Sequence, residues 1–102
     1  MDSIKGKIVL KNEIISGNLI FNNKIIEVSD VKNSNNDNYI IPGYIDLHCH
    51  GGRGYDTMDG LQSISQLSQY HLENGTTTMF PTTVTASLND TFNAMKGLNK
   101  FI

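Results

Sequence analysis

The sequence is poor in cysteine and has no long apolar run, and both absences exclude whole classes of protein. The single cysteine, Cys49, cannot form an internal disulfide bond, which is typical of a reducing cytosol. No apolar run approaches the roughly 20 residues of a membrane-spanning helix. The N-terminal segment lacks the uninterrupted apolar core of a secretory signal. We therefore expect a cytoplasmic protein with no membrane partner.

Charge is also scarce. Eight Lys and Arg residues stand against ten Asp and Glu residues, which leaves a formal net charge of −2. No cluster of basic residues offers a footprint for a phosphate backbone, so we expect no nucleic-acid partner. A length of 102 residues fits one small domain or part of a larger protein.

The first 41 residues are predicted to form short strands. Apolar and β-branched runs at 7–10, 17–21 and 24–28 are separated by polar and glycine breaks. Asn22 and Asn23 separate two runs, and asparagine tolerates the positive φ of a tight hairpin turn. A polar loop is expected at 29–38, followed by an extended run that Pro42 favours.

From Pro42 onward, strands and helices alternate. The pattern predicts strands at 44–50 and 76–84, each followed by an amphipathic helix. Strands that alternate with helices are typical of a parallel sheet. The apolar positions expected to face the core are Leu61, Ile64, Leu67 and Leu72 in the first helix and Leu88, Phe92, Met95 and Leu98 in the second.

Sequence signals also predict where the two helices begin and end. Asp59 and Gln62 form a candidate capping box for the first helix, and Gly75 is a candidate stop. Ser87 and Asp90 form a second candidate capping box.

Two histidines end the strand predicted at 44–50. Side chains two residues apart share one face of a strand, with Cα atoms roughly 6.5 Å apart, so Asp46, His48 and His50 lie on the same face. Two such imidazoles can converge on one divalent ion, at about 2.0–2.1 Å for zinc. Asp46 could orient a ligand or accept backbone hydrogen bonds. The alternative is a pair of partly exposed histidines at a strand end, since short motifs often occur by chance.

Other polar residues near this pair have simpler interpretations. Cys49 points to the opposite face, with Ile45 and Leu47, where a helix is expected to pack, so we interpret it as a small buried residue. His71 is predicted to lie on a solvated helix surface.

The segment 51–54 follows the two histidines. Gly51, Gly52 and Gly54 could form an amide nest for an anion or allow a sharp turn, and the turn is favoured. Arg53 could reach an anion or be solvated. The four residues form a possible substrate loop.

The wider context of the histidines resembles a known family. The stretch "PGYIDLHCHG" resembles the first barrel strand of the amidohydrolase superfamily, with its Pro-Gly-x-Ile-Asp-x-His-x-His signature. The stretches "HGGRGYDTMDG" and "NGTTTMFPTTVT" are similar to the N-acetylglucosamine-6-phosphate deacetylase family within it. The resemblance implies an α/β fold in which 1–41 contribute strands to a small β-sandwich and 42–102 begin a metal-dependent (β/α)8 barrel.

The resemblance also implies an activity. It implies metal-dependent hydrolysis of the sugar phosphate N-acetylglucosamine 6-phosphate to glucosamine 6-phosphate and acetate. His48 and His50 match the ligand pair for a divalent metal, zinc or iron, with Asp46 as a supporting residue. Alternatives are another amidohydrolase, of the dihydroorotase or aminoacylase kind, or a non-catalytic module.

The implied barrel is larger than this chain. Eight strands typically take about 250 residues, so we expect an N-terminal part of a longer, homo-oligomeric enzyme. The family's remaining ligands, catalytic aspartate and phosphate-binding residues match nothing here. No catalytic residue is therefore assigned within the chain, and we expect it to be inactive alone.

Overall fold

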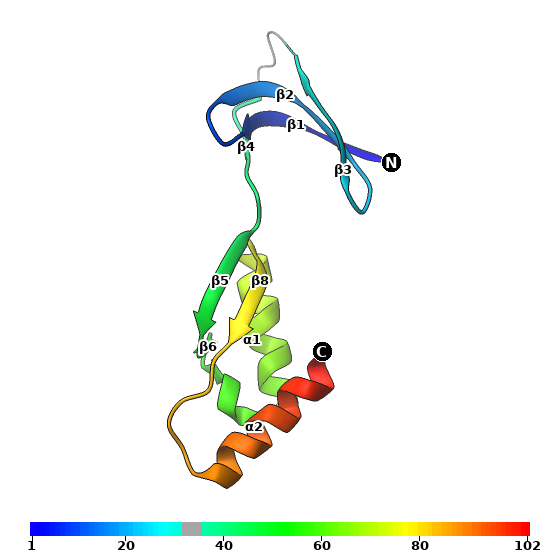
Figure 1. Cartoon of the computed structure of the whole chain (residues 1–102). Helices are drawn as coiled ribbons and strands as arrows, with labels where there is room; N and C mark the ends of the chain where they lie inside the picture. The colour runs from blue at the N-terminus through cyan, green and yellow to red at the C-terminus, as the bar shows by residue number, and fades with distance from the viewer. Residues whose placement is uncertain (32–35) are drawn as a thin grey trace. The chain divides into compact units, whose positions relative to one another are not determined.

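The computed structural model describes residues 1–31 and 36–102 and divides into two compact units, Met1–Pro42 and Gly43–Ile102 (Figure 1). The polar loop expected at 29–38 lies partly outside the described residues. The assignment of 1–41 to a β-sandwich and of 42–102 to a barrel stays a prediction.

The N-terminal unit is a four-stranded sheet in the order β3-β2-β1-β4. β1 and β3 both pair antiparallel with β2, and β4 pairs parallel with β1. The three apolar runs predicted to be strands are confirmed. The strands are β1 (Asp2–Val9), β2 (Ile14–Phe21), β3 (Ile25–Asp30) and β4 (Tyr39–Ile40).

The turn between β2 and β3 differs from the prediction in its conformation. Neither Asn22 nor Asn23 has a positive φ. Instead, the Asn22 side-chain oxygen accepts a hydrogen bond from the backbone N–H of Lys24 at 3.0 Å. The asparagine thus shapes this turn through its side chain, as in an Asx turn.

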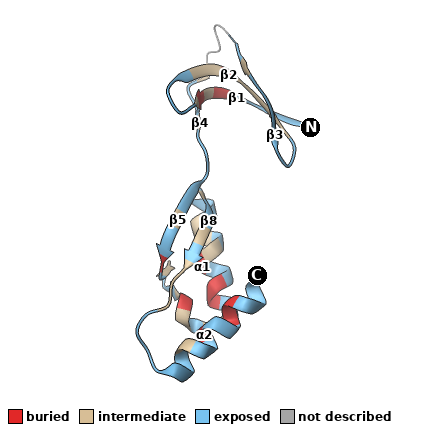
Figure 2. Cartoon of the chain, in the orientation of Figure 1, coloured by how far each residue is buried: buried red, intermediate tan, exposed pale blue. Residues whose placement is uncertain are grey.

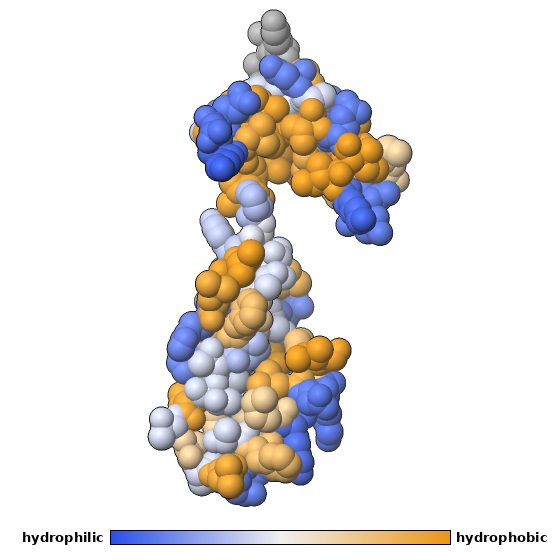
Figure 3. All heavy atoms as spheres, viewed as in Figure 1, coloured by the Kyte–Doolittle hydropathy of each residue, from blue (hydrophilic) through white to orange (hydrophobic). Residues whose placement is uncertain are grey.

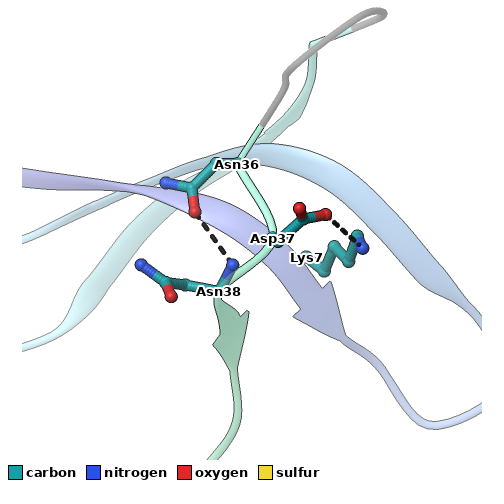
Figure 4. Close-up of polar contacts among 4 residues, drawn as sticks. All are labelled: Lys7, Asn36, Asp37 and Asn38. Carbon is teal, nitrogen blue, oxygen red and sulfur yellow. Dashed lines mark hydrogen bonds and ion pairs between the residues drawn. The ribbon is translucent and has the colours of Figure 1, made fainter.

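Polar contacts hold the segment before β4 against β1. Lys7 Nζ and Asp37 Oδ1 form an ion pair at 2.9 Å, and Asn36 Oδ1 accepts a hydrogen bond from Asn38 N at 2.9 Å (Figure 4). The Asn36 amide also donates to the Lys5 carbonyl at 2.7 Å. Hydrogen bonding and opposite charge raise the pKa of Lys7 and lower that of Asp37.

The apolar face of this sheet is largely open within the described residues. Ile8 is buried, but Ile4 and Val28, which share its face by the strand register, are exposed. Apolar side chains gather over the sheet in the view of Figure 3. A sheet buries such a face by packing against a second layer. The described residues of this unit supply one layer, and the predicted β-sandwich would need another.

The C-terminal unit alternates strands and helices, as predicted. β5 and β8 pair in parallel, and α1 connects them. Neither α-helix in the described part of the chain is long and apolar enough to cross a membrane. The elements are β5 (Tyr44–Cys49), β6 (Gly51–Gly52), β7 (Tyr55–Asp56), the 3-10 helix η1 (Thr57–Asp59), α1 (Leu61–Glu73), β8 (Thr76–Pro81) and α2 (Leu88–Phe101).

The core of this unit lies where α2 meets the start of α1 (Figure 2). Ile64 and Leu67 of α1 are fully buried, as predicted, whereas the prediction for Leu61 and Leu72 was wrong, because both are exposed. In α2 the buried residues are Ala94, Gly97 and Leu98. The prediction for this helix was wrong in part, because Leu88, Phe92 and Met95 are more than half exposed. α2 instead packs through Ala94 and Gly97, because Gly97 lies directly against the backbone of Gly60 and Leu61 at the start of α1.

Two of the three predicted helix signals are confirmed. The Ser87 hydroxyl accepts a hydrogen bond from Asp90 N at 3.1 Å and caps α2. Gly75 follows α1 with a φ of 94°. The Asp59 cap is wrong: α1 starts after Gly60 without a side-chain cap, because Asp59 lies in η1, which Asp56 caps.

Candidate metal centre

His48 and His50 come together at the carboxyl end of β5. Their Nε2 atoms are 2.9 Å apart, and the rings meet edge to face with centroids 4.7 Å apart. Both side chains are exposed. β8 runs parallel to β5, so its carboxyl end lies at the same edge, where parallel α/β folds bind ligands.

A backbone carbonyl after β8 fixes the orientation of one ring. Nδ1 of His50 lies 3.0 Å from the carbonyl oxygen of Thr82 and donates a hydrogen bond to it. The proton on Nδ1 leaves the Nε2 lone pair of His50 available. Metal-ligating histidines commonly make this bond with their second nitrogen.

The separation of the two Nε2 atoms suits a shared ion. At metal–nitrogen distances of about 2.0–2.1 Å, a separation of 2.9 Å gives a ligand–metal–ligand angle of about 90°. A small rotation that separates the atoms to about 3.3 Å gives a tetrahedral angle. The donor set therefore fits a divalent cation.

Asp46 supports the pair through the backbone. Its Oδ1 accepts a hydrogen bond from the backbone N–H of His48 at 3.0 Å. Two roles were considered for Asp46, orienting a ligand and accepting a backbone hydrogen bond, and this contact is of the second kind. No group of three or more potential metal ligands occurs in the described ranges 1–31 and 36–102, so the chain offers an ion two imidazoles.

The segment after His50 is a tight hairpin. Gly51 pairs with Asp56 and Gly52 with Tyr55, which leaves Arg53 and Gly54 as the turn. Their φ values of 52° and 82° are those of a two-residue type I′ turn. A Cβ atom at Gly51 would collide with the Tyr55 carbonyl oxygen. These glycines thus serve the sharp turn, and the exposed Arg53 keeps its place in a possible substrate loop as a prediction.

Cys49 and His71 meet on the buried side of this hairpin. The thiol is 4% exposed, and its Sγ atom lies 3.4 Å from His71 Nε2. His71 Nε2 donates to the Gly51 carbonyl at 3.0 Å, so the prediction that His71 is solvated was wrong. Burial raises the pKa of Cys49, which stays a neutral thiol. The prediction that Cys49 is a buried small residue is confirmed.

The apolar face of β5 is less covered than predicted. Ile45 and Leu47 are 64% and 72% exposed, although a helix was expected to pack on them. α1 packs on β8 and on the β6–β7 hairpin instead. Among the face's three residues, Cys49 alone is buried, because His71 of α1 reaches it.

Sequence reasoning missed Thr57, which lies beside the histidines. This residue is fully buried, and its backbone N–H donates to the His50 carbonyl at 2.8 Å. A threonine in the polar stretch "GYDTMDG" resembles an ordinary loop residue, and no periodicity marks it as buried.

Comparison with known proteins connects this geometry to a chemistry. No protein-family model matches the chain. It is 46% identical over 50 residues to the N-acetylglucosamine-6-phosphate deacetylase of Bacillus subtilis. It is 40% identical over 58 residues to an N-acetylgalactosamine-6-phosphate deacetylase of Escherichia coli. The chain resembles amino-sugar-phosphate deacetylases.

The likeness extends to the fold. A crystal structure of the N-acetylglucosamine-6-phosphate deacetylase of Thermotoga maritima superposes on 98% of this chain with a TM-score of 0.86 and 25% identity. The predicted order of strands followed by α/β elements is thereby supported. The matched segments span 13% and 15% of the two curated relatives, and the chain covers 28% of the Thermotoga protein.

Proposed function

We propose that this chain supplies two metal ligands of a deacetylase acting on N-acetylglucosamine 6-phosphate. The observation that carries the proposal is the convergence of the two Nε2 atoms, with His50 Nδ1 bound to the Thr82 carbonyl. Both the Bacillus and the Thermotoga proteins carry this activity in their names. The curated relative named for N-acetylgalactosamine 6-phosphate makes that epimer the second candidate substrate.

The reaction would add water across the amide bond, releasing acetate and leaving the sugar amine. A divalent ion such as zinc or iron would supply Lewis acidity to the amide carbonyl and to the attacking water. In the chain, His48 and His50 would bind it through Nε2. The Thr82 carbonyl would hold the proton on His50 Nδ1, and Asp46 would hold the backbone of His48.

The remaining chemistry needs groups that the described residues do not offer. Two imidazoles are fewer than the three protein ligands usual at a catalytic zinc site, and no general base accompanies them. We therefore propose that the activity belongs to a longer protein containing this chain. A cytoplasmic location and a homo-oligomeric state are part of the same proposal.

The test compares metal content and acetate release in the longer protein. Replacing both His48 and His50 with alanine should lower bound metal and reduce acetate release from N-acetylglucosamine 6-phosphate at least about 100-fold. Lys100→Ala, an exposed substitution on α2, is the control and should leave both unchanged. A double variant with normal metal content and rate would refute the assignment. Faster hydrolysis of N-acetylgalactosamine 6-phosphate would change the proposed substrate and leave the proposed metal ligands as they are.

A further inference from the structure

Thr57 contacts the backbone on both sides of the bond that joins Cys49 to His50. Its Oγ1 donates to the Cys49 carbonyl at 3.3 Å, and its N–H donates to the His50 carbonyl at 2.8 Å. The side chain is fully buried, so no water can replace the hydroxyl bond. Buried polar groups of this kind are costly to leave unpaired.

The Cys49 carbonyl links Thr57 to the orientation of the His50 ring. The Cys49 carbonyl also accepts a hydrogen bond from Thr82 N at 2.7 Å, and the Thr82 carbonyl accepts one from His50 Nδ1 at 3.0 Å. One Cys49 oxygen therefore has two donors, using both of its lone pairs. A displacement of this oxygen moves Thr82 and, with it, the partner of the imidazole.

The sheet itself holds the histidine end of β5 at one point. The β5–β8 register is irregular between Asp46 and Cys49, so the bond from Thr82 N to the Cys49 carbonyl is the strand-to-strand contact next to the histidines. Thr57 comes from η1, outside the ladder, and adds a second hydrogen bond to the same carbonyl.

We propose that Thr57 is a positioning residue for the His48–His50 pair, acting through the Cys49 carbonyl and Thr82. The proposal rests on the proposed metal site and extends it to a residue that touches no metal. Its specific content is that the hydroxyl of Thr57, more than its volume, keeps His50 in the Nδ1–H form with Nε2 toward His48.

The experiment uses matched variants and two readouts. Thr57→Val keeps the shape and removes the hydroxyl, Thr57→Ser keeps the hydroxyl, and Thr78→Val repeats the first change at an exposed site on β8. Nitrogen NMR of the metal-free 102-residue chain reports the tautomer of His50. Titration with Zn²⁺ against a chromophoric chelator reports affinity.

We expect Thr57→Val to shift His50 toward a mixture of tautomers and to weaken Zn²⁺ binding roughly tenfold, the low end for groups that support a ligand. Thr57→Ser and Thr78→Val should behave like the unaltered chain. If Thr57→Val does not fold, retention of both properties in Thr57→Ser and their loss in Thr57→Ala at low temperature would support the same role.

Two results have different meanings. An unchanged tautomer in a folded Thr57→Val variant would overturn the positioning role, whatever the metal does. Zn²⁺ binding that persists after both His48 and His50 are replaced would instead refute the proposed metal site, and the NMR readout would still decide the role of Thr57 in orienting His50.

Discussion

Gly97 in α2 offers a sharp test of how closely the two helices must approach. A Cβ atom at this position would lie 2.9 Å from Cα of Gly60 and 3.0 Å from the backbone N of Leu61. Both neighbours are backbone atoms at the start of α1, so no side chain can rotate away. A Gly97→Ala variant must separate the helices or distort η1 and the turn at Gly60.

Two effects of opposite sign compete in Gly97→Ala. Replacing glycine by alanine inside a helix stabilises it by about 1 kcal/mol. Overpacking a tight contact costs about 1–3 kcal/mol. Because the contact is with backbone, we expect the cost of overpacking to exceed the gain in helix propensity, so that the free energy of unfolding falls by about 1 kcal/mol. For a domain of this size the melting temperature should fall by about 4–8 °C.

Far-UV circular dichroism during thermal and urea unfolding measures this effect. The helices of the described residues lie in the unit Gly43–Ile102, so the helical signal follows that unit. Asn99→Ala, on the exposed side of the same helix, is the control and should raise stability by a few tenths of a kcal/mol. A Gly97→Ala variant as stable as Asn99→Ala would show that the contact has room for a methyl group.

Three further substitutions test a cap, a turn and an ion pair. Ser87→Ala removes the cap on Asp90 N and should cost about 1 kcal/mol in urea unfolding, while Ser87→Thr, which keeps the hydroxyl that also donates to Asp90 Oδ2, should retain most of it. Arg53→Gly relieves a φ of 52° and should raise the free energy of unfolding by up to about 1 kcal/mol, measured as a higher urea midpoint; a lower midpoint would contradict the type I′ turn. Asp37→Asn breaks the pair with Lys7. The pKa of Asp37 lies below its ordinary 3.8, so its contribution is complete above that pH and is lost as the pH falls further. In urea unfolding, Asp37→Asn should lack this small loss of stability at acidic pH. If the variant and the unaltered chain have the same pH profile at low salt, the pair contributes nothing to stability.

The sequence alone predicted features that depend on short segments. The Ser87 cap and the stop at Gly75 depend on backbone groups within a few residues, so the local sequence was enough to predict them. The placement of His48 and His50 on one face follows from the strand period of two. The match of the stretch around them to a known signature suggested the chemistry, which the similarity to deacetylases supports.

Only the tertiary structure decided which residues are buried and what the histidines contact. Phe92 and Leu98 were both expected to face the core, yet of the two only Leu98 is buried, because α2 approaches α1 through Gly97. Thr57 and His71 show no periodic signal, and their roles depend on carbonyls of residues 49–51. The bond from His50 to the Thr82 carbonyl joins residues 32 apart in the chain. Such contacts exist only after β5 and β8 pair, because packing between distant segments, and no local preference, brings their donors and acceptors together.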